Sequence, residues 1–144
     1  MNKFLMSCAN EDEGDDDEIM DLLMQRRNIF ASDNDVYMFD EIDPQSQLLL
    51  EKAVLGAKKF LLSKYGESMQ FTDGILPYPI KLHINSPGGE AYSSLALYDF
   101  IKNFDIPIVG VVEGMAASGA SLVLCGCHFK TMTENSVILA HEVR

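Results

Sequence analysis

Apolar residues recur along this 144-residue chain at two spacings, one typical of helices and one typical of strands. From Asp43 to about Tyr65 they fall mainly three and four positions apart, which predicts a helix with one buried face. Asp43 can cap the free amides, Pro44 suits the first helical turn, and Gly66 ends the helix. The same periodicity predicts a second helix over residues 90–104.

Shorter apolar runs between and after these helices predict strands. The runs at 79–85 and 108–113 are rich in Ile and Val, as expected of strands covered on both faces. A short apolar helix is expected from Ser118 to about Cys125. Further extended segments are predicted at 28–30, 36–39, 129–132 and 137–140, the last two as a hairpin around a turn at 134–136. Strands alternating with helices imply βαβ units and a largely parallel sheet, hence an α/β fold.

The net charge of −11 is concentrated near the N-terminus. Eight of the eleven residues from Glu11 to Asp21 are acidic, which leaves 14 acidic and 11 basic side chains elsewhere. Because a run of like charges repels itself, we expect residues 1–27 to be a disordered acidic arm and residues 28–144 to be the folded domain. A second interpretation stays open, in which the apolar residues at 19–24 form a short amphipathic turn that docks on a partner.

Composition excludes several classes of protein. The chain has no basic cluster, and this argues against nucleic-acid binding, which needs many Lys and Arg contacts to phosphate. No apolar run approaches the roughly 18 residues of a membrane helix, and the apolar patch at the N-terminus is too short for a secretion signal. Three cysteines (Cys8, Cys125 and Cys127) form no disulfide framework, so we expect a cytoplasmic setting.

The candidate chemistry lies where predicted strands end. Gly88 and Gly89 follow one strand, Ser118 lies in a turn of small residues before an apolar helix, and His141 ends a later strand. Functional groups in α/β folds gather at such strand ends. A serine at a helix N-terminus lies beside free amides, and the Gly119 and Gly89 amides could both donate to an oxyanion. His141 is the best placed base for the serine.

Each signal also has a structural explanation when it is taken alone. SPGG is a turn sequence, AAS before an apolar helix is usually a helix cap, and a single histidine is more often structural than catalytic. The run from Cys125 to His128 could be read as a metal cluster, but a helix end running into a turn is the favoured interpretation. The ordered combination of the signals is what favours catalysis.

That combination resembles a known family. INSPGG at 84–89, the serine of GMAASGAS 29 residues after Gly89, and ENSVILAH at 134–141 together resemble the Clp protease proteolytic subunit, including its phage-encoded relatives, over about residues 28–144. The resemblance implies a ClpP/crotonase-like fold of repeated βαβ units. It also implies a serine endopeptidase that works through an acyl-enzyme, with Ser118 as nucleophile, His141 as general base, and the Gly89 and Gly119 amides as oxyanion hole.

The resemblance further implies partners. Such subunits form homo-oligomeric rings that hydrolyse protein and peptide substrates, and a ring ATPase unfoldase delivers these substrates. We expect no cofactor, metal or nucleotide site in this chain, since it carries no P-loop motif.

Three departures from the family pattern stand out. The family carries an Asp about 50 residues beyond the histidine, which orients it, and a helix-and-strand handle in the same region. Neither is present in these 144 residues, so the third triad acid is unassigned and the fold is expected to lack the handle and the last elements. We expect a fragment of a longer reading frame rather than a naturally short, inactive subunit. Residues 67–78 are expected to be an insertion, and the loop between Ser118 and His141 is about two residues shorter than usual.

Two other classes of function remain open from the sequence. A catalytically inactive, ClpP-like interaction subunit would need none of the reactive groups. A crotonase-type acyl-CoA enzyme would share the fold and the two-amide oxyanion hole, but the pairing of AAS with NSxxxxH speaks against it.

Overall fold

The computed structural model describes residues 13–66 and 78–142 of the chain. In this part the elements follow the order α1 (Glu13–Arg26), β1 (Ile29–Ser32), β2 (Asp35–Met38), α2 (Pro44–Tyr65), β3 (Ile80–Ser86), α3 (Ala91–Lys102), β4 (Ile108–Ala117), α4 (Gly119–Gly126), β5 (Phe129–Met132) and β6 (Val137–Leu139). No helix within the described ranges is both long enough and apolar enough to cross a membrane. The expected connection at 67–78 lies outside the described residues except for Tyr78.

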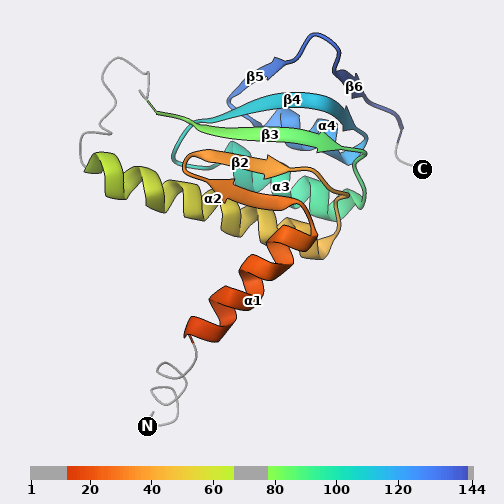
Figure 1. The fold of residues 1–144 in the computed structure, drawn as a ribbon. Coiled ribbons are helices and arrows are strands. Elements are labelled where there is room, and N and C mark those ends of the chain that lie inside the picture. The colour runs from red at the N-terminus through yellow and green to blue at the C-terminus, as the bar shows by residue number, and fades with distance from the viewer. Residues whose placement is uncertain (1–12, 67–77, 143–144) are drawn as a thin grey trace, which may run out of the picture.

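The strands form one sheet in the order β1-β2-β3-β4-β5, and β6 also pairs with β4 (Figure 1). The first pair, β1 with β2, is antiparallel, whereas β2 with β3 and β3 with β4 are parallel. Helices α2 and α3 follow β2 and β3 along the chain, as in βαβ units. The predicted α/β fold with a largely parallel sheet is confirmed.

The predicted hairpin at the end of the chain is wrong. Strand β5 pairs with Val109–Val112 and β6 with Met115–Ala117, and both run parallel to β4. The turn between them is closed by a hydrogen bond from the Ser136 amide to the Thr133 carbonyl, while the Thr133 amide bonds to Val112. This turn therefore displaces the chain without reversing it, and the two strands are successive segments along one side of β4.

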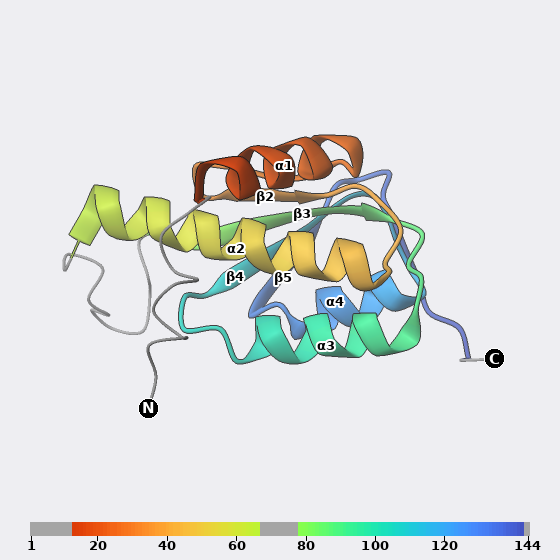
Figure 2. The same ribbon diagram turned by 90° about the horizontal axis from the view of Figure 1, so that it is seen from below.

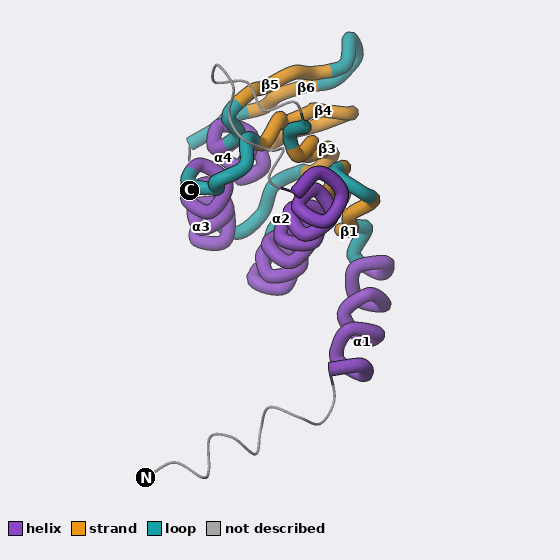
Figure 3. The backbone as a smooth tube through the Cα atoms, turned by 90° about the vertical axis from the view of Figure 1, so that its left-hand side faces the viewer, coloured by secondary structure: helices purple, strands orange, loops and turns teal. Residues whose placement is uncertain are grey.

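Helices cover one face of the sheet. Figure 3 shows α2, α3 and α4 together on one side of the strands. The alternating burial of β3 follows from this arrangement, because Leu82 and Ile84 point into the helical layer while Lys81 is exposed on the other face. On that open face Tyr37 stacks between Phe30 and His83.

The N-terminal segment differs from the sequence prediction. Residues Glu13–Arg26 form helix α1, where the charge pattern predicts a disordered arm. The helix packs Met20, Leu23 and Met24 against the core, and this apolar contact favours order despite the charge. Figures 1 and 2 show α1 next to β2, and Figure 1 shows its N-terminal end directed away from the sheet.

Helix α2 begins and ends where the sequence predicts. Asp43 accepts a hydrogen bond from the Ser46 amide, the Ser46 hydroxyl accepts one from the Asp43 amide, and Pro44 follows the cap. At the other end Gly66 has a positive φ of 51°, which suits glycine. Local chemistry therefore sets both ends of the longest helix.

Candidate active site

Ser118 joins the end of β4 directly to the start of α4. Its φ of 52° and ψ of −123° lie in a region that non-glycine residues rarely adopt. The Ser118 amide donates to the Leu139 carbonyl at 2.7 Å, which ties this turn to β6. Its hydroxyl makes no capping hydrogen bond to α4, so the side chain does not act as the helix cap that such a serine usually provides. Ser118 is half-buried, and a strained serine between a strand and a helix is a geometry in which nucleophiles are found.

The glycine pair of SPGG packs closely against this turn. Gly88 has a φ of 89°, and a Cβ there would lie 2.7 Å from the Gly119 amide nitrogen and 2.8 Å from the Ser118 Cβ. Only glycine permits such an approach of two backbone segments. The loop therefore places the Gly88–Gly89 backbone beside the serine turn.

Gly119 and Gly89 present neighbouring backbone amides. A Cβ at Gly119 would lie 3.4 Å from the Gly89 nitrogen, and it would also collide with the Ser94 hydroxyl. Neither amide has a hydrogen-bond acceptor among residues 13–66 and 78–142. Two adjacent free N–H groups at the start of a helix can bind a developing negative charge.

His141 follows β6 and is exposed. Its Nδ1 lies 2.7 Å from the backbone carbonyl oxygen of Glu142. Within the described part of the chain no carboxylate contacts this ring. The histidine that does contact carboxylates is His83, with Glu113 at Nδ1 (2.6 Å) and Asp35 at Nε2 (2.9 Å), on the open face of the sheet.

These groups meet in one pocket of about 310 Å³. It is lined by Gly89, Ala91, Ser118, Gly119, Ser121, Leu122, Ala140 and His141. The expected nucleophile and base, Ser118 and His141, and the two glycines expected to form the oxyanion hole, Gly89 and Gly119, thus line a single cavity. Two larger cavities lie beside α1, and their described lining contains no Ser, Cys or His.

The Cys125–His128 run does not converge on one point. The Cys127 thiol is buried and donates to the Val123 carbonyl, while His128 accepts a hydrogen bond from the Ile108 amide. Burial raises the pKa of the Cys127 thiol to about 12, which keeps it protonated. No group of three or more His, Cys, Asp and Glu side chains within the described ranges is arranged to hold a metal ion.

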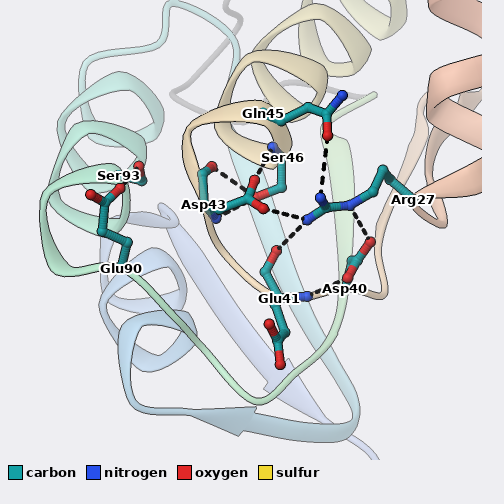
Figure 4. Close-up of polar contacts among 8 residues, drawn as sticks. All are labelled: Arg27, Asp40, Glu41, Asp43, Gln45, Ser46, Glu90 and Ser93. Atoms are coloured by element: carbon teal, nitrogen blue, oxygen red, sulfur yellow. Dashed lines mark hydrogen bonds and ion pairs between the residues drawn. The ribbon is translucent and has the colours of Figure 1, made fainter.

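Sequence reasoning missed the segment that supports the glycine loop. Residues 40–43 lie against Gly88–Glu90, and Arg27 binds the carboxylates of Asp40 and Asp43 (Figure 4). Burial alone would lower the pKa of Arg27, but its hydrogen bonds to the two carboxylates outweigh burial and raise it. No local pattern signals this contact, because it joins residues that are far apart in the sequence.

Comparison with known proteins gives consistent results. The sequence profile of the Clp protease family matches residues 69–143. The ATP-dependent Clp protease proteolytic subunit of Deinococcus radiodurans is 40% identical over 65 residues, which cover 44% of this chain and 32% of that protein. Proteolytic subunit 3 of Rhodococcus jostii is 42% identical over 65 residues, with the same two coverages. The matched region thus spans about a third of the length of these curated relatives.

The comparison of structures covers more of the chain than the comparison of sequences. The ClpP protease catalytic domain from Plasmodium falciparum superimposes with a TM-score of 0.57 at 21% sequence identity, and the match covers 92% of this chain and 64% of that one. This likeness shows a shared fold. Because the family profile also matches more than half of the chain, including the serine turn, the glycine loop and the strand before His141, the chain belongs to the Clp protease family.

Proposed function

We propose that this chain is a serine endopeptidase subunit that hydrolyses peptide bonds through an acyl-enzyme on Ser118. The observation that supports this most directly is the shared pocket, which Ser118 and His141 line together with the two glycines whose amides are free. The backbone strain at Ser118 and the absence of a capping hydrogen bond from its hydroxyl agree with a nucleophile.

The proton path follows from the contact of His141. A carbonyl oxygen only accepts hydrogen bonds, so the contact with Glu142 assigns the ring proton to Nδ1 and leaves Nε2 free to accept. In the proposed reaction Nε2 takes the Ser118 proton as Oγ bonds to the substrate carbonyl carbon. The C–N bond then breaks, and the imidazolium gives that proton to the departing amine. A water molecule then gives a proton to Nε2 and attacks the ester carbonyl carbon. The bond to Ser118 Oγ breaks, and Oγ takes the proton back as the carboxylic acid leaves.

The two glycine amides would stabilise the charge on the substrate oxygen in this reaction. Both N–H groups lie beside Ser118, and the N-terminus of α4 adds its positive dipole end. Loss of one oxyanion donor typically costs about 10²–10³-fold in turnover. This contribution does not depend on how well the histidine is oriented.

One observation favours a second candidate function, an inactive interaction subunit. His141 is exposed, and among the described residues it has a backbone carbonyl where a triad would have a carboxylate. A carbonyl oxygen can hold the proton on Nδ1, but it carries no full negative charge and stabilises the imidazolium that forms in the reaction less than a carboxylate does. A crotonase-type acyl-CoA enzyme is the third candidate, but it would need only the amides and not the Ser118–His141 pair.

The partners are proposed from the relatives. Their names describe proteolytic subunits of ATP-dependent Clp proteases. We therefore propose protein and peptide substrates, a homo-oligomeric ring, a ring ATPase unfoldase that consumes the ATP, and a cytoplasmic setting. These proposals concern a whole subunit, of which the matched region is about a third.

Labelling with a fluorophosphonate tests the proposal. We expect a covalent adduct on the parent chain, detected by intact mass, and no adduct on Ser118→Ala. Ser63→Ala is the matched control, because Ser63 lies on the exposed face of α2 and bonds only to the Phe60 carbonyl. His141→Gln should slow labelling strongly if the histidine is the base.

The outcomes separate the three candidates. No adduct on a chain shown to be folded would refute the peptidase proposal for this chain and favour the interaction subunit. An adduct together with cleavage of short fluorogenic peptides supports the proposal. Turnover of acyl-CoA that survives Ser118→Ala would instead favour the crotonase-type enzyme.

A further inference from the structure

We propose that Arg27 is a positioning residue for the glycine loop, Gly88–Glu90, and acts on it through the support segment, residues 40–43. The loop carries the Gly89 amide, so the catalytic part of this inference rests on the proposed function. Its structural part concerns only how the loop is held. Arg27 lies immediately after α1, far in the sequence from the residues that it would position.

The guanidinium of Arg27 contacts three residues of the support segment and the nearby Gln45 (Figure 4). Its Nε donates to Asp40 Oδ2 at 2.7 Å, and Nη2 donates to Asp43 Oδ2 at 2.9 Å. Weaker contacts reach Gln45 Oε1 at 3.3 Å and the Glu41 carbonyl at 3.5 Å. The planar array of donors on arginine can hold two carboxylates at once, which a lysine cannot do in the same geometry.

The support segment is bonded in turn to the glycine loop. The Ile42 amide donates to the Gly88 carbonyl at 2.8 Å, and the Glu90 amide donates to the Ile42 carbonyl at 2.8 Å. These two bonds flank Gly89 on both sides. A Cβ at Gly89 would lie 2.0 Å from the Ile42 oxygen, so the glycine rests directly on this carbonyl. The position of Gly89 is therefore set by the position of Ile42.

The glycine loop is also linked, through Ser94, to the surroundings of the Gly119 amide. The Ser94 hydroxyl donates to the Glu90 carbonyl at 2.7 Å and occupies the space beside Gly119. A shift of the loop would thus change the environment of both free amides. Arg27 thus holds Asp40 and Asp43, and Ile42 between them is hydrogen-bonded to Gly88 and Glu90, the two neighbours of Gly89.

The negative charge of the support segment explains why a cation is needed beside it. The support segment contains Asp40, Glu41 and Asp43, three carboxylates within four residues. Asp43 is engaged by the Ser46 amide at its other oxygen, so it cannot move away without breaking the cap of α2. Removal of the guanidinium would leave these carboxylates to repel one another, and the segment between them would loosen.

The test compares Arg27→Gln and Arg27→Lys with a matched control, Arg26→Gln, because Arg26 is exposed and adjacent. Amide hydrogen exchange by NMR reports the bonds directly at Ile42 and Glu90, and the Leu82 and Ile84 amides of β3 report global opening. We expect exchange at Ile42 and Glu90 to rise about tenfold or more in Arg27→Gln, to rise less in Arg27→Lys, and to stay at the parent value in Arg26→Gln.

Fluorophosphonate kinetics provide the second readout, because the phosphoryl oxygen of the reagent occupies the oxyanion site. In Arg27→Gln we expect the maximal inactivation rate to fall about tenfold, with the half-saturating concentration nearly unchanged. A purely structural role would lower the amount of folded protein and would leave the rate per folded molecule unchanged. If Arg27→Gln does not fold, Asp40→Asn removes one ionic bond, spares the α2 cap, and should show the same pattern more weakly.

Each outcome bears on the proposal. Unchanged exchange at Ile42 and Glu90, or an equal rise at Leu82 and Ile84, would overturn it. A local rise in exchange with no slowing of inactivation would overturn the role of Arg27 in positioning the Gly89 amide. A local rise in a chain whose parent form does not label would uphold the support of the loop by Arg27, and the proposed peptidase function alone would fail.

Discussion

Gly89 is the residue at which backbone geometry and proposed chemistry coincide. Its φ is 157°, and a Cβ built on it would lie 2.0 Å from the Ile42 carbonyl oxygen, so there is no room for a methyl group. Gly56, in the middle of α2, is the opposite case, since apart from its chain neighbours and the nearby backbone of its own helix no atom lies within 4 Å of a Cβ built there. The pair allows the same chemical change to be compared at a constrained and an unconstrained glycine.

We expect Gly89→Ala to lower the free energy of unfolding by about 1–3 kcal/mol and to slow fluorophosphonate labelling about 10²-fold. Gly56→Ala should raise that free energy by about 0.5–1 kcal/mol and leave labelling unchanged, because alanine favours a helix interior. Urea unfolding and labelling rates measure both effects. Since each variant changes the unfolded chain similarly, a loss of labelling in Gly56→Ala or normal labelling in Gly89→Ala would contradict the assignment of the loop.

At the level of single elements, α2 shows how much of the fold is encoded locally. Asp43, Pro44 and Gly66 predicted its ends, and the structure has the cap, the proline and the glycine in these places. The hydrogen bond from the Ser46 amide, opposed by burial and assisted by Arg27, lowers the pKa of Asp43. The cap thus favours the ionised carboxylate in the folded state.

This lowered pKa predicts how stability depends on pH. Because the folded-state pKa lies below the unfolded value of about 3.9, ionised Asp43 stabilises the folded chain above that pH, and this contribution is lost as the pH falls through the folded pKa. Asp43→Asn keeps a capping oxygen, so it should be nearly as stable as the parent in strong acid and less stable at pH 7. Thermal unfolding between pH 2 and 7 checks this, with the exposed Asp99→Asn as control. Parallel pH curves for the parent and Asp43→Asn would contradict it.

The predictions that failed involve elements whose structure is set by distant contacts. The charge of α1 suggested disorder, but Met20, Leu23 and Met24 pack against the core. The last two strands looked like a hairpin, but both pair with β4, which extends to Ala117 beyond the predicted end at Glu113. The contact between Ile42 and Gly89 and the role of Arg27 had no local signal for the same reason. By contrast, the residues of the candidate site could be proposed from the sequence, because the SPGG glycines, Ser118 and His141 each follow the end of a strand.

At the scale of the whole molecule, the edge of the sheet along β5 and β6 carries no further strand among the described residues. Strand β6 pairs with β4 on one side, and no described strand lies on its other side. Its three residues are all apolar and exposed, with Val137 at 56%, Ile138 at 46% and Leu139 at 53%. An exposed apolar strand edge is a template for association with another chain. Leu139 also accepts the Ser118 amide, so this edge is continuous with the candidate site.

We therefore expect the chain to self-associate through β6, and a charge at this edge to weaken the association. Val137→Lys should shift sedimentation velocity toward smaller species at a given concentration, because a lysine on an edge strand opposes the pairing of a second strand. Leu62→Lys is the matched control, since Leu62 is also an exposed apolar side chain (46%) but lies on α2. Circular dichroism would show that both variants are folded. If Leu62→Lys disperses the chain and Val137→Lys does not, the contact lies on the helical face, and the open edge of β6 is not the surface at which subunits meet.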